Sequence, residues 1–240
     1  MRKSLVAALI AASAATSACG QTRGADGGPT VSRNYQVGNF QQIEVAGPYD
    51  VQVRTGGNPG VSATGGQNLL EHTVVEVKGD KLVIRPERKG WFQGWSARGK
   101  ANFAVTVPEL RAATIAGSGD IQVDKVHGDS FEGTVAGSGG LNVGQLDVQT
   151  LKIEIAGSGG AKAMGGRAQS GSFDIAGSGD IDARGIQTQA ADVSIAGSGS
   201  IAAHASGTAK VNIMGSGDVE ITGGAKCSVT KAGSGEVRCS

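Results

Sequence analysis

Residues 171–183 read GSFDIAGSGDIDA, and this stretch decides the fold. Phe173 and Ile175 alternate with polar residues, which is typical of a β-strand that buries one face. A Gly-Ser-Gly triplet follows at 177–179, and the alternation resumes behind it with Ile181 and Ala183. The stretch therefore predicts two strands joined by a tight corner, with the apolar side chains of both strands facing one interior.

The Gly-Ser-Gly corner occurs seven times. It begins at residues 117, 137, 157, 177, 197, 215 and 233, so the spacings are 20, 20, 20, 20, 18 and 18. A fixed period in this range indicates stacked units, none of which could bury its apolar edge alone. No pattern repeats at 3.6 residues, and hairpins would place turns at alternate ends. Residues 111–240 are therefore predicted to form a parallel β-solenoid, or β-helix, with coils of about 20 residues in an all-β protein.

The corner itself sets two expectations. Its glycines are expected to reach positive φ and to let adjacent corners stack closely. The seven serines are then expected to lie in one line along an edge, each hydroxyl bonded to a neighbouring serine or to corner backbone.

The N-terminal half, residues 32–110, contains a degenerate copy of the same motif. VAGPYDVQV at 45–53 aligns with IAGSGDIQV at 115–123. Further strands are predicted at 74–78, 81–85 and 101–107, separated by longer and less regular loops. This β-rich half is expected to cap the open end of the solenoid.

The start of the chain has the layout of a secretory signal peptide over residues 1–18. Arg2 and Lys3 precede an apolar stretch too short to cross a bilayer, and small residues lead to Cys19. This arrangement resembles a bacterial lipobox, although Thr16 stands where Leu is usual, so Cys19 is the predicted lipidation site. The alternative is ordinary cleavage at the same bond. Residues 19–31 read as a flexible linker, and the predicted location is the bacterial cell envelope, at the outer membrane or in the periplasm.

Charge argues against nucleic acid as a partner. The whole chain has 22 basic and 21 acidic side chains, and removal of Arg2 and Lys3 with the signal peptide leaves 20 against 21, a net of −1. With 41 glycines and only 4% aromatic residues, the composition fits a repeat better than a compact globular core.

Two cysteines flank the last corner at inward positions of the final coil. Because the exported compartment permits oxidation, Cys227 and Cys239 are predicted to form a disulfide that closes this end of the solenoid.

Several segments together resemble one known family. They are the lipobox-like start, FQQIEV at 40–45, PEL at 108–110 and the repeated IAGSGD units. Over about residues 33–240 the chain is similar to the head GIN domain family of autotransporter adhesins. The resemblance implies an exported bacterial β-helical domain, and it supplies no catalytic residues and no cofactor.

Residue chemistry gives little support for a catalytic or metal site. Each corner serine directly follows Gly, unlike the nucleophile of a G-x-S-x-G elbow. Asp120, Asp180 and Asp218 are expected to tie down their turns. Asp218 and Glu236 share a column in adjacent coils, where a cation or a solvated pair are the two alternatives. The three histidines occupy unrelated positions, so exposed loops are expected for them and no metal site is predicted.

One segment departs from the repeat, between Arg85 and Lys100. It is rich in aromatic and basic residues, which suit contact with a glycan, an anionic polymer or an envelope surface. The alternative is that the rings fold back and seal an apolar edge. The candidate binding residues are Trp91, Phe92, Trp95, Arg88, Lys89 and Arg98.

Two functions are consistent with these patterns. The first is a non-catalytic binding, adhesion or scaffold module at the cell envelope, with a glycan or the envelope surface as partner and the membrane reached through Cys19 if it is acylated. The alternative is a polysaccharide-cleaving enzyme that acts on the lateral face of the β-helix with a pair of carboxylates.

Overall fold

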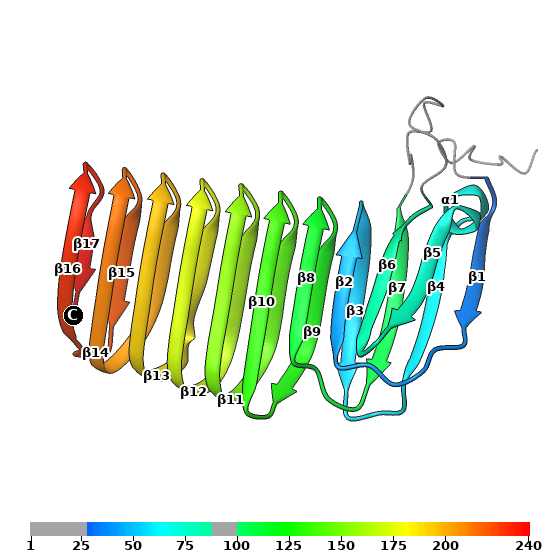
Figure 1. The fold of residues 1–240 in the computed structure, drawn as a ribbon, viewed down its shortest axis with the longest axis horizontal. Coiled ribbons are helices and arrows are strands. Elements are labelled where there is room, and N and C mark those ends of the chain that lie inside the picture. The colour runs from blue at the N-terminus through cyan, green and yellow to red at the C-terminus, as the bar shows by residue number, and fades with distance from the viewer. Residues whose placement is uncertain (1–27, 88–99) are drawn as a thin grey trace, which may run out of the picture.

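The computed structural model describes residues 28–87 and 100–240. In these residues flattened β-coils are stacked along one axis, and a cap of antiparallel strands and a short helix closes the N-terminal end (Figure 1). Within the described residues, no helix is both long enough and apolar enough to span a membrane. The predicted all-β solenoid with coils of about 20 residues is confirmed.

Each coil consists of a strand that enters the corner, the corner, a strand that leaves it, and a far turn. The longer strands run from one corner to the next and include the far turn, so they lie on both sides of the coil. The strands of the solenoid are β8 (Ala112–Gly117), β9 (Asp120–His127), β10 (Ser130–Gly137), β11 (Gly140–Gly157), β12 (Gly160–Gly177), β13 (Asp180–Gly197), β14 (Ser200–Gly215), β15 (Asp218–Thr222), β16 (Lys226–Gly233) and β17 (Val237–Cys239).

The period of the sequence becomes the register of the sheet. Val135 lies beside Ile155, Ile155 beside Ile175 and Ile175 beside Ile195, always 20 residues apart in parallel strands. Ile195 lies beside Ile213, only 18 residues on, and the two missing residues are taken up between Ala183 and Ala190 at the far turn. The corner is therefore kept unchanged, and the far turn absorbs the difference in coil length.

The interior is filled by columns of apolar side chains whose sizes compensate one another. In the coil of Phe131 the neighbouring inward position is Gly133, whereas in the coil of Phe173 the glycine is Gly171. A Cβ added at Gly171 would lie 2.8 Å from the ring of Phe173, so this ring occupies the space of the missing side chain. Interiors have near-crystalline packing density, so Phe173 needs Gly171. At Gly133 an added Cβ would instead lie 2.5 Å from Cδ2 of Leu141 and 3.6 Å from the ring of Phe131.

The corners stack through their backbone. Gly157 has φ +135°, and an added Cβ would overlap the carbonyl oxygen of Gly137 in the preceding coil. That same oxygen accepts the N–H of Ser158 at 2.9 Å and the N–H of Gly159 at 3.0 Å. A residue without a side chain and with positive φ is required here.

The seven serines lie in one line along the corner edge, as expected, because their flanking glycines are aligned from coil to coil. The expectation for their hydroxyl groups is wrong. The serine side chains are exposed, and in the described residues none of these hydroxyls bonds to protein; the corner is held by backbone N–H groups. Serine is tolerated here as a small residue that water can solvate.

The N-terminal half continues the stack. Strands β2 (Gln42–Ala46) and β3 (Tyr49–Thr55) pair in parallel with β8 and β9, and Val45 lies beside Ile115 while Val53 lies beside Val123. The sequence alignment of residues 45–53 with residues 115–123 is therefore also the register in which these strands pair. On the other side of this coil, β6 (Lys81–Pro86) pairs with β2, and β7 (Ala101–Val107) pairs with β3.

Antiparallel strands then end the parallel stack. Strand β4 (Gly60–Gly66) pairs with β7 and with β1 (Thr30–Tyr35), and β5 (Thr73–Lys78) pairs with β6. Helix α1 (Gln67–Glu71) buries Leu69 and Leu70 in the interior of this end. The three strands predicted after residue 70 are confirmed, and the N-terminal half closes the solenoid as expected.

At the C-terminal end, none of the described residues covers the last coil in this way, and Val229 is 46% exposed. Lys231 stands where the preceding coils have Ile, and its Nζ donates to the carbonyl oxygen of Gly235 at 2.7 Å. A charged side chain at an otherwise apolar position discourages the end of the sheet from pairing with another chain. The predicted disulfide between Cys227 and Cys239 is present in this last coil.

Candidate functional site

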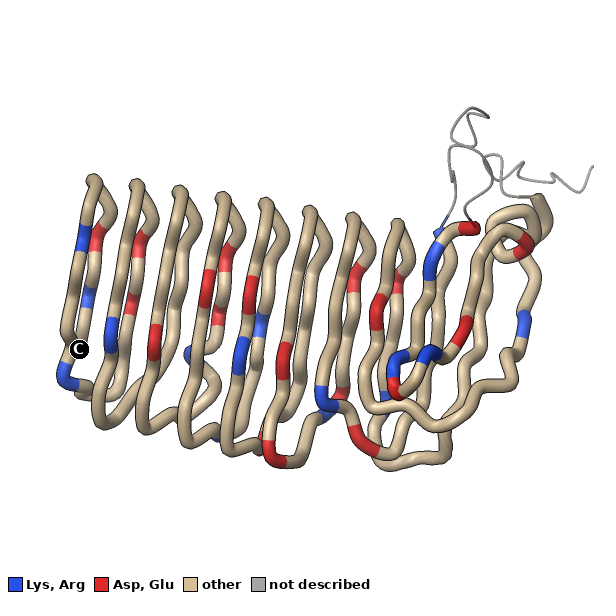
Figure 2. The backbone as a smooth tube through the Cα atoms, viewed as in Figure 1, with Lys and Arg blue, Asp and Glu red and all other residues tan. Residues whose placement is uncertain are grey.

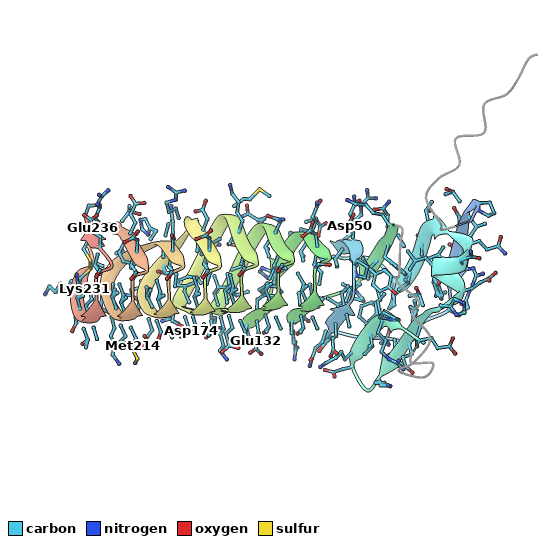
Figure 3. The ribbon with its side chains drawn as sticks, turned by 90° about the horizontal axis from the view of Figure 1, so that it is seen from above. Asp50, Glu132, Asp174, Met214, Lys231 and Glu236 are labelled. Carbon is cyan, nitrogen blue, oxygen red and sulfur yellow. A yellow bond between two sulfur atoms is a disulfide. The ribbon has the colours of Figure 1, made fainter. Side chains whose placement is uncertain are left out.

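The solenoid has two broad faces that meet at the corner edge. We call the outward side chains of the strands that enter the corner the pre-corner face, and those of the strands that leave it the post-corner face. Figure 3 shows Asp50 and Glu236 on the post-corner face and Glu132, Asp174 and Met214 on the opposite side. The Gly-Ser-Gly triplets themselves carry no charge (Figure 2), and acidic residues directly follow four of them, Asp120, Asp180, Asp218 and Glu236.

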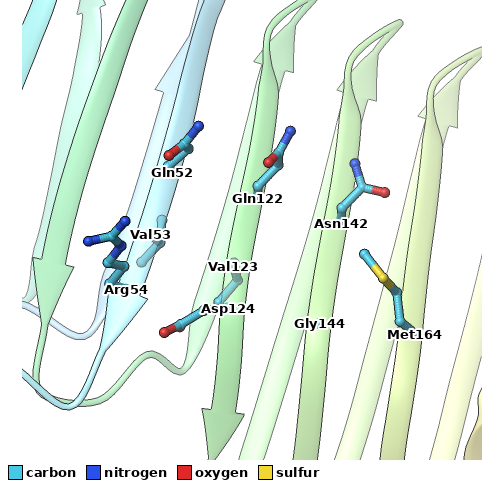
Figure 4. A pocket seen from close by; sticks show the side chains of 9 residues that line it. All are labelled: Gln52, Val53, Arg54, Gln122, Val123, Asp124, Asn142, Gly144 and Met164. Atoms are coloured by element: carbon cyan, nitrogen blue, oxygen red, sulfur yellow. The ribbon is translucent and has the colours of Figure 1, made fainter.

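A shallow trough crosses successive coils of the post-corner face. Its first section is a depression of about 420 Å³ (Figure 4), its second of about 530 Å³ and its third of about 230 Å³. The first and second sections share Asn142, and the second and third share Ser200 and Ala202. The trough therefore extends from Gln52, in the coil next to the cap, to Arg238 in the last coil.

Three side-chain amides form a ladder in the first section. Gln52 lies beside Gln122, and Gln122 lies beside Asn142, each the third residue after its corner. All three project outward from neighbouring strands (Figure 4), and no hydrogen bond to another described residue engages them. A primary amide has two donor hydrogens and one acceptor oxygen, so the ladder presents unused donors and acceptors at the spacing of the coils, about 4.8 Å.

The trough is deepened by glycines in its wall. At Gly144 an added Cβ would overlap the carbonyl oxygen of Asp124, and at Gly140 it would lie 2.8 Å from Oδ1 of Asp120. Met164 closes this section with a side chain that is 57% exposed, an unusual position for a large apolar residue. The section thus combines free amides with one apolar contact surface.

The corner aspartates hold coils together. Oδ1 of Asp120 accepts the N–H of Gly140 at 2.7 Å, Oδ1 of Asp180 accepts the N–H of Ser200 at 3.1 Å, and Oδ1 of Asp218 accepts the N–H of Glu236 at 2.8 Å. The acceptor and donor are one coil apart in every case. The prediction that these carboxylates have a structural role at the turn is therefore right. Each carboxylate, however, accepts its hydrogen bond from the next coil and not from its own turn.

Ion pairs occupy the second and third sections. Arg184 makes two hydrogen bonds to Asp182, of 3.0 and 3.1 Å, and these bonds hold the pKa of the Asp182 carboxyl below its usual value. Arg238 makes the same fork with Glu236, at 2.9 and 3.0 Å, and lowers the pKa of Glu236. Lys162 lies 3.8 Å from Asp182. The charged groups in these two sections largely pair with one another, whereas the amides of the first section bond to nothing within residues 28–87 and 100–240.

The remaining predicted positions are scattered. Glu236 is engaged by Arg238 and Asp218 by backbone, so the structure does not set these two carboxylates apart for a cation. No group of three or more His, Cys, Asp or Glu side chains that could hold a metal ion is found among the described residues. His72 lies 3.5 Å from Glu87, and His204 belongs to β14 with Nδ1 buried, so the expectation of a loop is wrong for His204.

The other predicted site residues lie outside the described residues. These are Cys19 and the loop residues Arg88, Lys89, Trp91, Phe92, Trp95 and Arg98. Strand β6 ends at Pro86 and β7 begins at Ala101, so the segment between them connects two strands where other coils have a Gly-Ser-Gly corner.

Sequence reasoning missed the amide ladder. A signal was present, because Gln52, Gln122 and Asn142 each stand three positions after a corner. Outward positions of a solenoid vary freely, and only the register shows that these three amides are neighbours.

Comparisons with solved structures agree with this architecture. A protein from Bacteroides fragilis NCTC 9343 described as a "putative adhesin" has a TM-score of 0.77 and 22% identity, over 88% of this chain and 97% of its own. One from Parabacteroides distasonis ATCC 8503 described as a "putative lipid binding protein" has a TM-score of 0.69 and 26% identity, over 89% and 97%. A "putative adhesin" from the same organism has a TM-score of 0.70 and 24% identity, over 89% and 98%.

No curated protein matches the chain. A family model does match, and it covers residues 39–225, which is most of the chain and includes the trough down to the start of the last coil. The chain therefore belongs to the family described as "Putative auto-transporter adhesin, head GIN domain".

Proposed function

We propose that the protein is an exported, non-catalytic binding module of the bacterial cell envelope, attached to a membrane through acylated Cys19. The observation that carries the proposal is the trough of the post-corner face, whose first section presents side-chain amides that bond to none of the residues described. A row of donors and acceptors held at fixed spacing by a rigid scaffold can bind a ligand without first being ordered. Membership of an adhesin family and the signal-peptide layout of residues 1–18 support the same function.

Binding is tested with residues 20–240, the mature chain without the lipidation site Cys19, immobilised and incubated with fragments of bacterial envelope, purified envelope polysaccharide and lipid vesicles. Saturable retention of any of these supports the proposal, and its chemical nature identifies the partner class. Vesicles are included because a relative with 26% identity is described as lipid binding. Retention no greater than that of an unrelated β-solenoid of similar charge would contradict the proposal.

Anchoring is tested separately in cells. The full chain and a Cys19→Ala variant are expressed with a radiolabelled fatty acid. The full chain is expected to incorporate label and to sediment with membranes, whereas the variant is expected to do neither. Equal labelling of both chains, or no labelling of either, would contradict acylation at Cys19.

The loop residues of the β6–β7 connection are a second candidate contact. We expect that alanine at Trp91, Phe92 and Trp95 weakens retention of envelope material while the unfolding transition is kept. If retention is unchanged but the chain is less stable, the rings serve to seal the cap.

A polysaccharide-cleaving enzyme is the competing function. A general acid at neutral pH needs a raised pKa. Among the described carboxyl groups with a resolved shift, Glu76, Asp182 and Glu236, the pKa is lowered in every case by hydrogen bonds from Lys or Arg. Reducing-end assays on the polysaccharides that are retained decide between the two functions, because products that accumulate with time would establish the enzyme.

A further inference from the structure

We infer that the first section of the trough binds an extended, uncharged β-linked oligosaccharide that lies along the solenoid axis, with about one sugar unit over each coil. This inference rests on the proposed binding function and names the ligand class of the same surface. It assigns the contacts to Gln52, Gln122, Asn142 and Met164, which lie in four successive coils.

The spacing of the amides is the first argument. Neighbouring coils of a parallel sheet are about 4.8 Å apart, so the four coils from Gln52 to Met164 span about 14 Å. A pyranose unit of an extended β-linked chain advances by nearly the same distance. An oligosaccharide along the axis would therefore place one sugar unit over each amide. Successive units of an extended β-1,4-linked chain are turned by about 180°, so the amides meet alternate hydroxyl edges, and a primary amide can bond to either edge because it both donates and accepts.

The chemistry of the side chains is the second argument. Sugar hydroxyls both donate and accept, and each amide can do the same in return. The amides bond to no other described residue, so a ligand does not have to break protein contacts to reach them. On the pre-corner face, by contrast, Lys152 bonds to Glu132 at 3.3 Å and to Glu154 at 2.7 Å, which leaves that surface engaged with itself.

Charge and apolar surface complete the argument. Arg54 and Asp124 flank this section with opposite charges, so it has no net preference for an ionic polymer. The exposed thioether of Met164 offers an apolar surface for the C–H groups of a sugar ring. Because water already solvates the amides, each sugar adds little binding energy, and affinity must accumulate along the chain.

The test uses the mature chain with cello-oligosaccharides and chito-oligosaccharides of one to six units. Affinity is measured by calorimetry, and the bound residues are located by NMR from the side-chain amide resonances. We expect affinity to rise about tenfold or more from two to four units and then to level off. The resonances of Gln52, Gln122 and Asn142 are expected to shift, while that of Asn212, an outward amide on the pre-corner face, stays unchanged.

Variants provide the second readout. The double variant Gln122→Ala/Asn142→Ala is expected to lose at least about tenfold in affinity for the four-unit ligand. The matched control Asn212→Ala removes an amide of the opposite face and should bind as the wild type does, and both variants are checked for an unchanged thermal transition.

Three results would overturn the inference: no binding of either series by the wild type, affinity independent of length, or shifts that map away from the trough. Retention of envelope material by the wild type is measured independently. If such retention persists while these oligosaccharides fail, the binding function stands and only the assigned ligand class is wrong.

Discussion

The Gly-Ser-Gly corner makes a sharp prediction about which of its residues stabilise the solenoid. In Gly157→Ala the new Cβ would overlap the carbonyl oxygen of Gly137 at a backbone with φ +135°. Positive φ costs about 1–3 kcal/mol for a residue with a side chain. Displacing the oxygen also weakens its bonds from Ser158 and Gly159, which contribute about 0.5–1.5 kcal/mol each. Gly157→Ala should therefore lower the free energy of unfolding by about 2–6 kcal/mol.

The serine between these glycines is the matched control. Its hydroxyl is exposed and has no protein partner among the described residues, so Ser158→Ala should change the free energy of unfolding by less than about 0.5 kcal/mol. Urea titration of the mature chain measures both variants, and hydrogen exchange shows whether the loss is centred on coils adjacent to residue 157. Equal effects of the two substitutions, or a loss below about 1 kcal/mol for Gly157→Ala, would refute the account of a corner held by backbone.

Three further predictions follow from the interior, the open end and the trough. Gly171→Leu alone should destabilise the fold by about 1–3 kcal/mol, because the new side chain overpacks against Phe173. Adding Phe173→Ile should restore most of the lost stability, because the pair then matches Leu151 and Ile153 of the preceding coil, and additive effects of the two substitutions would contradict this. Reducing the disulfide between Cys227 and Cys239 should destabilise the last coil by about 3 kcal/mol. Hydrogen exchange should then show that β16 and β17 lose protection while β11 stays protected, and a uniform loss of protection along the solenoid would contradict coupling between neighbouring coils only. Because Arg184 lowers the pKa of Asp182, this carboxylate stabilises the fold above its unfolded pKa, about 3.9, and the contribution is lost as pH falls through the lower folded value. Asp182→Asn should therefore cost about 0.5–1 kcal/mol in urea at pH 7 and progressively less as the pH falls below about 3.9, whereas a cost independent of pH would contradict the pairing.

The solenoid could be predicted because the repeat period of the sequence determines which residues of adjacent coils are neighbours. In parallel coils of constant length, residues one period apart become neighbours, so the alignment of 45–53 with 115–123 is also a list of contacts. The cap could not be placed in the same way. Strands β6 and β7 lie on the outer side of β2 and β3, although they come later in the chain, and no local pattern encodes which side of a coil the next one takes.

The candidate site escaped prediction for a related reason. Inward positions are constrained by packing, so Ile155, Ile175 and Ile195 repeat and reveal their column at once. Outward positions need only be solvated. Asn142 and Lys162 share a column, yet the amide of Asn142 bonds to no other described residue whereas Lys162 lies near Asp182. Whether an outward side chain is available to a ligand depends on its neighbours in adjacent coils, and these become known only when the register is combined with side-chain geometry. If solenoid sequences are aligned coil by coil at their repeat period, columns of Asn and Gln at outward positions would identify such surfaces before a structure is known.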